Sequence, residues 1–173
     1  PSRWGGGSGV TGWHPGEGGD GAAVREQRAG GVQQVAGTRG AFAAVKSDGS
    51  VVTWGPPGEG GDSTAVREQL AGEVQQVAGT YGAFAAVKSD GSVVTWGHPG
   101  EGGDSTAVRE QLAGEVQQVA GTRGAFAAVK SDGSVVTWGS PGEGGDSTAV
   151  REQLAGEVQQ VAGTYGALAA VKS

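Results

Sequence analysis

The sequence contains no cysteine and no methionine, and it also lacks asparagine. Without cysteine the chain has no disulfide bond and no thiolate site, and nothing in it indicates a redox compartment. Without asparagine it has no acceptor for N-linked sugar, whereas glycosylation of serine and threonine stays open. Because no initiator methionine is present, we expect the chain to be processed or to be a piece of a longer protein.

Long apolar runs and clusters of positive charge are also missing. No stretch approaches the roughly 18 apolar residues of a membrane span, and no signal-peptide pattern is present, so we expect no membrane insertion. The 18 acidic and 12 basic side chains give a net charge of −6, spread along the chain. This balance, without a basic patch, predicts no binding to nucleic acid or to anionic membranes.

Glycine, in contrast, accounts for 37 of the 173 residues, a share that alone would suggest a low-complexity chain. An internal repeat offers a better explanation. Trp54, Trp96 and Trp138 recur at intervals of 42 residues, a period found in propeller blades and other repeat architectures. Small side chains let such units stack closely, and neighbouring units supply the burial that each lacks alone.

The repeats divide the chain into a leading segment and four units. Residues 1–13 form a degenerate N-terminal strand segment, in which residues 7–13 are an imperfect copy of residues 49–55 with tryptophan and glycine exchanged. The units are residues 14–55, 56–97, 98–139 and 140–173, the last of which lacks its final strand. Arg28 stands where the next unit has Leu70, so we expect the first end to be frayed or differently packed.

Each unit contains a segment that predicts a β-hairpin, at residues 83–97 in the second unit. Asp90-Gly91 is a strong signal for a two-residue turn in which both residues have positive φ. Such a turn pairs Val87 with Val94 and Ala85 with Trp96 on one face, and Phe84 with Gly97, Ala86 with Thr95 and Lys88 with Val93 on the other. Both faces are largely apolar, so we expect the hairpin to lie between copies of itself.

The rest of the unit predicts a loop, a short helix or irregular segment, and one more strand. Residues 57–61 are turn formers. Asp62 or Ser63 is placed to cap a helix over residues 63–70, which Gly72 would end. The three strands are expected near residues 74–80, 83–88 and 92–96. The predicted fold class is therefore all-β, with tandem β-propeller-like blades of three strands plus a short helix or loop.

Two runs resemble the regulator of chromosome condensation (RCC1-like) repeat: Val74-x-x-Val77-Ala78-Gly79, and Asp90-Gly91-x-Val93-x-x-Trp96-Gly97. The resemblance covers about two-thirds of each unit. It extends to the long tandem arrays found in dinoflagellates. It implies a β-propeller, usually of seven blades, whose members act through protein–protein contacts as an exchange factor, an ultraviolet sensor or a β-lactamase inhibitor. The Pro-Gly-Glu-Gly-Gly-Asp segment departs from the family, and none of its functional residues carries over.

Three architectures fit the repeats: an open stacked array that forms a filament, a closed ring of four blades, and a segment of a larger propeller. An open array predicts a non-enzymatic structural scaffold that self-associates head to tail, extracellular if it is polymeric. A closed ring predicts a binding module for a protein or glycan partner. Unpaired strand edges readily pair with further strands, so we predict that residues 167–172 pair with residues 8–13, within one molecule or between two.

Two sets of residues are candidates for packing or binding. The aromatic residues of the hairpins are expected to pack between repeats, with an aromatic ladder for sugars or bases as the alternative; these are Trp54, Trp96, Trp138, Phe42, Phe84 and Phe126. Trp4 and Trp13 are out of register and expected to be exposed. The one position that varies systematically predicts an exposed partner contact, or else a tolerant loop position; it holds Arg39, Tyr81, Arg123 and Tyr165.

The sequence contains no pattern that favours a metal site or a catalytic site. The recurring Glu-Gly-Gly-Asp run, residues 59–62 in the second unit, offers too few oxygens for Ca²⁺ and reads as a turn with a capping aspartate. His14 and His98 occupy a position that is Pro56 or Ser140 elsewhere, which a metal site would not tolerate. No nucleophile–base spacing is present, so we expect no metal, no cofactor and no enzyme.

Overall fold

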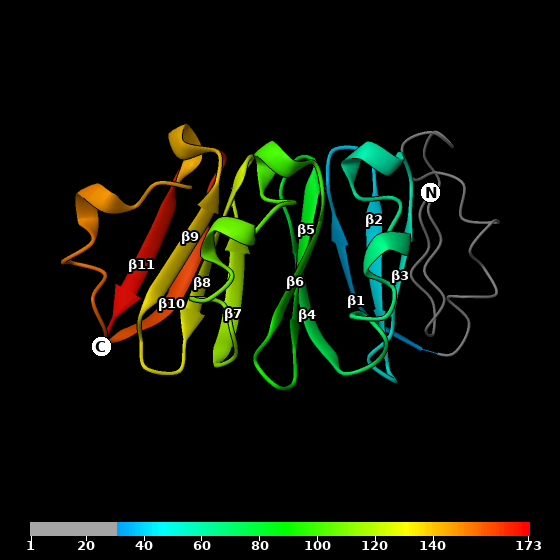
Figure 1. Cartoon of the computed structure of the whole chain (residues 1–173), viewed down its shortest axis with the longest axis horizontal. Helices are drawn as coiled ribbons and strands as arrows, with labels where there is room; N and C mark the ends of the chain where they lie inside the picture. The colour runs from blue at the N-terminus through cyan, green and yellow to red at the C-terminus, as the bar shows by residue number, and fades with distance from the viewer. Residues whose placement is uncertain (1–30) are drawn as a thin grey trace.

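The computed structural model describes residues 31–173 as a row of small antiparallel sheets that follow one another along the long axis (Figure 1). The first sheet is β1 (Val32–Gly37), β2 (Phe42–Lys46) and β3 (Val51–Trp54); the second is β4 (Val74–Gly79), β5 (Ala83–Lys88) and β6 (Val93–Gly97). The third is β7 (Val116–Gly121), β8 (Ala125–Lys130) and β9 (Val135–Gly139), and the fourth is β10 (Val158–Gly163) with β11 (Leu168–Lys172). The predicted all-β class is confirmed, and the three predicted strands of a unit are present in the first three sheets.

Short 3₁₀ turns connect the sheets, both in the predicted loop at residues 57–61 and in the segment predicted as a short helix or irregular, and at the equivalent places of the later units. They are η3 (Pro57–Glu59), η4 (Thr64–Val66), η5 (Pro99–Glu101), η6 (Thr106–Val108), η7 (Pro141–Glu143) and η8 (Thr148–Val150). No α-helix forms over residues 63–70. Asp62 accepts a hydrogen bond from the Thr64 backbone N–H, Leu70 is buried as the apolar anchor, and Gly72 ends the segment at φ +73°.

The hairpin turn differs from the predicted one. Only Gly91 has positive φ, because the turn closes from the Gly91 N–H to the Lys88 carbonyl over 2.9 Å and Lys88 then bonds to Ser92. This is a three-residue loop with a glycine bulge rather than a two-residue turn. The register is therefore one residue off the prediction: Phe84 pairs with Trp96, Ala86 with Val94 and Val87 with Val93.

This register sorts each sheet into two unlike faces. The tryptophan face of the second sheet carries Phe84, Trp96, Val94 and Val77, and its alanine face carries Ala83, Ala85 and Val87. A bulge in β4 between Val74 and Gln76 turns both valines of that strand, Val74 and Val77, to the tryptophan face.

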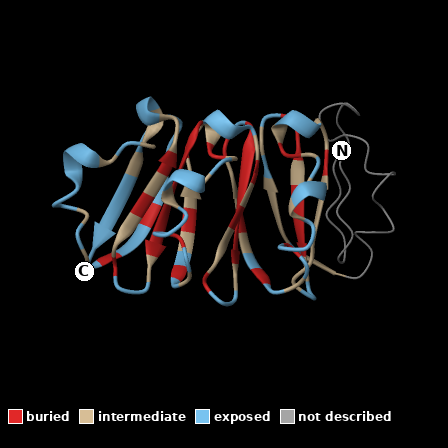
Figure 2. Ribbon diagram, in the orientation of Figure 1, coloured by how far each residue is buried: buried red, intermediate tan, exposed pale blue. Residues whose placement is uncertain are grey.

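The hydrophobic core lies between sheets, with the alanine face of one against the tryptophan face of the next. One cluster joins Ala41, Ala43 and Val45 of the first sheet to Leu70, Val77, Phe84 and Trp96 of the second, and an equivalent cluster joins the second sheet to the third. Figure 2 shows buried residues concentrated in the middle strands, while β11 is exposed. Each interface is therefore filled by small side chains from one sheet and large side chains from the next.

The first strands of successive units approach one another most closely. A Cβ atom added to Gly79 would lie closer than 3.0 Å to the Gly37 carbonyl, and Gly121 and Gly163 have the same relation to Gly79 and Gly121. Each glycine thus lets two backbones touch.

Glutamine side chains join the same strands. The Gln76 amide donates to the Val119 carbonyl (2.9 Å) and accepts from the Val119 N–H (3.3 Å). Gln34 and Gln118 make the same pair of bonds to Val77 and Val161. These bonds satisfy one N–H and one C=O on the outer edge of each of β4, β7 and β10, where no strand pairs with them.

We expect Gly79→Ala to destabilise the protein, because its methyl group would overlap the Gly37 backbone. Overpacking of this kind costs about 1–3 kcal/mol, and for a chain of this size each kcal/mol lowers the Tm by about 2–4 °C. Thermal unfolding followed by circular dichroism measures the shift. The matched control is Gly58→Ala, where the new methyl group meets nothing within 4 Å; equal Tm values for both variants would contradict the close contact.

Candidate functional site

The variable residues Arg39, Tyr81, Arg123 and Tyr165 line up along the edge where the first strands meet. Each follows a threonine that holds the loop between the first two strands of its sheet. The Thr80 hydroxyl accepts from the Ala83 N–H (3.1 Å) and donates to the Glu101 carbonyl (2.8 Å), and Thr122 repeats both bonds. Both threonines are buried, so the loop conformation is the same whatever residue follows.

Backbone hydrogen bonds connect these variable residues from one unit to the next. The N–H of Arg39 donates to the Tyr81 carbonyl (2.8 Å), that of Tyr81 to Arg123 (2.8 Å) and that of Arg123 to Tyr165 (2.9 Å). Backbones joined in this way lie about 4.8 Å apart, whereas stacked sheets are about 10 Å apart. The units therefore converge at this edge, as the blades of a propeller do.

The four variable residues form what we call the Arg/Tyr column, in which the side chains of Tyr81 and Arg123 both contact Tyr165. Arg123 lies between Glu143, with which it forms an ion pair, and Tyr165, whose hydroxyl accepts a 2.6 Å bond from Nη1. Its guanidinium carbon lies 4.6 Å from the centre of the Tyr165 ring. The rings of Tyr81 and Tyr165, two units apart, meet edge to face at 5.6 Å, a contact that the convergence of the units makes possible.

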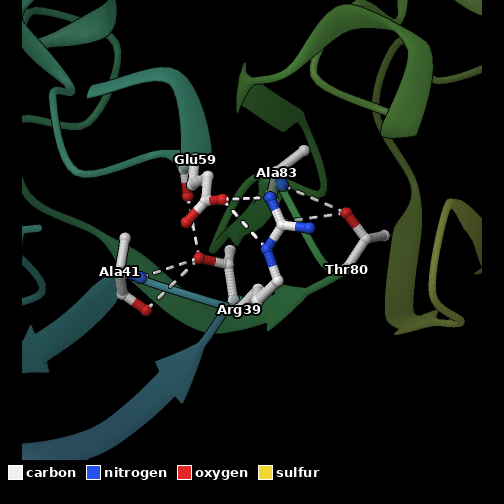
Figure 3. Close-up of polar contacts among 6 residues, drawn as sticks. Arg39, Ala41, Glu59, Thr80 and Ala83 are labelled. Atoms are coloured by element: carbon white, nitrogen blue, oxygen red, sulfur yellow. Dashed lines mark hydrogen bonds and ion pairs between the residues drawn. The ribbon is translucent and has the colours of Figure 1, made fainter. Parts of the chain in front are cut away.

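Arg39 shows how a charged member of the column is held (Figure 3). Its guanidinium turns toward Glu59, and Nε donates to Oε1 over 3.1 Å. Glu59 itself lies over Gly40, where a Cβ atom would overlap its carboxylate. The Arg39 side chain is 70% exposed, so the pair is accessible to a partner.

The pKa values of the two tyrosines shift in opposite directions because their neighbours differ. Hydrogen bonds from Arg123 and from Tyr81 lower the pKa of Tyr165 by favouring its phenolate. Desolvation, followed by the bond with Tyr165, raises the pKa of Tyr81.

The aromatic residues of the hairpins lie inside the protein. Trp96 is 5% exposed, and its indole N–H donates to the Gly60 carbonyl of the preceding loop over 3.1 Å. Trp138 makes the same bond to Gly102, and the Phe84 and Trp96 ring centres are 5.4 Å apart. Trp54 and Phe126 are also buried, and Phe42 is half-buried. None of these rings is placed to stack on an external sugar or base.

The Glu-Gly-Gly-Asp loops pack against the buried aromatic residues and the neighbouring backbone. Gly60 lies against the Phe84 ring, and Gly61 lies against the Gly55 carbonyl, closer than any larger residue allows. The Thr64 hydroxyl and backbone N–H both donate to Asp62 and lower the pKa of its carboxyl. Among residues 31–173, no group of three or more histidine or acidic side chains is arranged to hold a metal ion.

The remaining sequence-based candidates are placed as follows. His98 accepts a hydrogen bond from the Gly100 N–H through Nδ1 (3.2 Å) and caps η5. Trp4, Trp13, His14, Arg28 and residues 8–13 lie outside the described residues, so the expectations about them stay predictions. In residues 31–173, no helix has the length and apolar character needed to cross a membrane.

No protein-family model matches the chain, and no curated protein is significantly similar to it. Solved structures are similar. Human WBSCR16 matches with a TM-score of 0.57 and 21% identity, over 90% of this chain and 46% of that one. Prp20p of Saccharomyces cerevisiae, the yeast RCC1, matches with a TM-score of 0.57 and 17% identity, over 82% of this chain and 42% of that one. The repeats are RCC1-like in fold.

A structure described as a WD40 domain is also similar to this chain. The CRINKLY WD40 ectodomain of the Arabidopsis thaliana receptor kinase ACR4 has a TM-score of 0.55 and 14% identity, over 84% of this chain and 47% of that one. The chain spans less than half the length of each of these neighbours. At these identities the likeness concerns the fold, and the sheets are β-propeller-like blades.

The chain has only two tyrosines, so their titration can be followed by absorbance near 295 nm. We expect two steps, with Tyr165 ionising below the ordinary tyrosine pKa and Tyr81 above it. Because the folded-state pKa of Tyr165 is lowered, its contribution to stability is present above the ordinary value and lost as the pH falls through the lowered one. The raised pKa of Tyr81 acts in reverse: its contribution is present below the ordinary value and lost as the pH rises through the raised one.

Arg123→Gln should move the first step upward, because it removes the hydrogen bond that contributes most to lowering the pKa of Tyr165. Arg151→Gln, which removes an exposed arginine from a different segment, should leave both steps in place. A single transition in the parent chain would contradict the arrangement.

Proposed function

We propose that the protein is a non-enzymatic repeat scaffold whose molecules associate head to tail through the contact that already joins its RCC1-like repeats. The observation that carries this is the contact between the alanine face of one sheet and the tryptophan face of the next, which recurs along the stack. Ala85, Val87, Ala127 and Val129 are at most 2% exposed because the next tryptophan face covers them. Val171 at the equivalent position is 57% exposed, and Ala169 is exposed beside it.

The chemistry of the stacking contact supports directional growth. An alanine face meets a tryptophan face and never its own kind, so the interface is heterologous. Heterologous contacts extend into a filament unless the rotation between units closes a ring. Between molecules, such growth would bury the exposed face of β10 and β11 under the tryptophan face of a second copy.

The edge of β11 concerns the predicted pairing of residues 167–172. Within residues 31–173 this strand pairs only with β10, and an unpaired edge presents a row of backbone donors and acceptors to a further strand. Pairing with residues 8–13 remains a prediction.

Light scattering coupled to size-exclusion chromatography tests the proposal over a range of concentrations. The parent chain should form species larger than the monomer that grow with concentration. Val171→Lys should prevent this, because it buries a charge in the new interface. Gln117→Lys adds the same charge at an exposed position within the stack and should associate like the parent. A parent that stays monomeric, or a Val171→Lys variant that still associates, would show the proposal to be wrong.

A second candidate is a binding module for a protein partner, favoured by the Arg/Tyr column. Tyr165 is 61% and Tyr81 36% exposed, and arginine and tyrosine are the residues that dominate protein interfaces. The neighbour Prp20p is itself described as binding Gsp1p and histones, and yeast RCC1 as bound by Kap60.

Arrays of acidic and basic peptides test this second candidate. Exposed arginines predict retention of acidic peptides, and a Tyr165→Ser, Arg39→Ser variant should lose them. Equal binding of both charge classes, or no effect of the two substitutions, would argue against the column as a binding surface.

A further inference from the structure

The third strand of the second sheet lies at the floor of a groove of about 440 Å³, which we call the edge groove. Residues 92–95 of β6 form its floor. Val66 and Gln69 of the linker before the sheet form one wall, and residues from the run 103–113 of the linker after the sheet form the other. Figure 1 shows these linkers on either side of β6. The same floor and second wall recur 42 residues earlier along β3, around a volume of about 580 Å³.

The hydrogen bonds of the sheet leave backbone groups of β6 facing this groove. Lys88 donates its N–H to the Ser92 carbonyl over 2.9 Å. Hydrogen-bonded and non-bonded pairs alternate along an antiparallel ladder. Val94 therefore bonds to β5, whereas the N–H and C=O groups of Val93 and Thr95 point away from it. Within residues 31–173 these four groups make no hydrogen bond, because β6 pairs with β5 alone.

The opposite edge of the sheet is treated differently. There the Gln34 amide bonds to one N–H and one C=O of Val77. No side chain does this at β6, where the Thr95 hydroxyl instead turns to the Gly103 carbonyl (3.1 Å) and the Ser105 hydroxyl (2.9 Å) of the wall. Propeller blades typically have four strands, and this sheet has three. The edge groove is thus an open position for a fourth strand.

The two walls differ in chemistry. On the tryptophan face Val66 packs against the cluster that contains Val94, so this wall offers an apolar contact. The other wall offers the hydroxyl of Ser105 and two opposite charges, Asp104 and Arg109. Because these charges balance, the groove favours neither an acidic nor a basic segment, and an unpaired charge placed in it would lose hydration without compensation.

The register fixes which side chain of an added strand meets which wall. In an antiparallel pair, residues opposite each other share a face, and bonded pairs exchange both hydrogen bonds. Residues opposite Val93 and Thr95 would turn their N–H groups to β6 and their side chains to the hydroxyl wall. The residue between them, opposite Val94, would turn its side chain to Val66 and its N–H to solvent. Alternating threonine and valine match this arrangement.

We propose that the edge groove binds an uncharged, extended segment of a partner protein, with alternating hydroxyl and apolar β-branched residues such as Thr-Val-Thr, as a fourth strand antiparallel to β6. Main-chain bonds would supply affinity and the two walls specificity, the mode known as β-strand addition. The strands of residues 31–173 are all paired in their own sheets, so the segment comes from another protein. The site uses neither the stacking faces nor the Arg/Tyr column.

A fluorescein-labelled peptide, Gly-Ser-Thr-Val-Thr-Val-Thr-Ser-Gly, is the probe, and fluorescence anisotropy with the 173-residue chain measures its binding. N-methylation of the threonines removes the N–H groups that face β6 and should weaken binding about tenfold or more. N-methylation of the valines removes N–H groups that face solvent and should leave the affinity within about twofold. Adsorption through apolar side chains alone would treat the two peptides alike.

Protein variants test the same bonds from the other side. The double variant Thr53→Pro, Thr95→Pro removes an N–H from each groove at edge positions that tolerate proline, and should weaken binding about tenfold or more. The matched double variant Thr53→Ala, Thr95→Ala loses the same side-chain bonds, keeps the N–H groups and should bind like the parent. Thermal unfolding followed by circular dichroism shows whether each variant is folded; if the proline variant is not, the two methylated peptides decide.

Two outcomes would overturn the inference: equal weakening by the two sets of N-methyl groups, or a folded proline variant that binds as well as the alanine variant. Val171→Lys and the Tyr165→Ser, Arg39→Ser variant should both bind the peptide like the parent, which separates the edge groove from head-to-tail association and from the Arg/Tyr column. Loss of binding in either of them would place the peptide elsewhere and contradict the proposal.

Discussion

The contact between the first strands of successive units governs the rest of the structure. At Gly79 and its equivalents one backbone touches the next, and no side chain larger than hydrogen fits between them. This closeness brings the Gln76 amide within reach of Val119 and lets Arg39 bond to Tyr81 through the backbone. Elsewhere phenylalanine and tryptophan hold the same sheets farther apart. Each unit is therefore wedge-shaped, narrow at the first strand, as the blades of a propeller are.

Unequal faces explain how a chain so poor in large side chains folds. Each interface needs one layer of bulky residues, which the tryptophan face supplies, and one layer that leaves room, which Ala83, Ala85 and Val87 supply. A single repeat buries neither layer alone, so stability resides in nearest-neighbour contacts. The same inequality gives the stack a direction, on which the proposed scaffold depends.

The Arg/Tyr column shows how a site varies on an invariant frame. Thr80 and Thr122 hold the loops through backbone groups alone, so the following residue changes without disturbing the fold. Where arginine stands, the glutamate above it is neutralised, as in Arg39 with Glu59. Where tyrosine stands, an aromatic surface replaces the ion pair. The alternation of arginine and tyrosine at this position therefore changes the charge and aromatic character along one edge, while the backbone stays the same.

Much of this architecture follows from the sequence by itself. The 42-residue period, the three strands of each unit and the RCC1-like pattern depend on local signals: turn glycines, β-branched runs and recurring tryptophans. The hairpin register did not follow from it, because Asp-Gly serves either a two-residue turn or a three-residue loop with a bulge, and only the packing of Phe84 on Trp96 selects between them. Nor did the role of Gln76, or the meeting of Tyr81 with Tyr165 across two units. These contacts depend on the distance and angle between repeats, which arise from all the side chains of an interface together and are encoded at no single position.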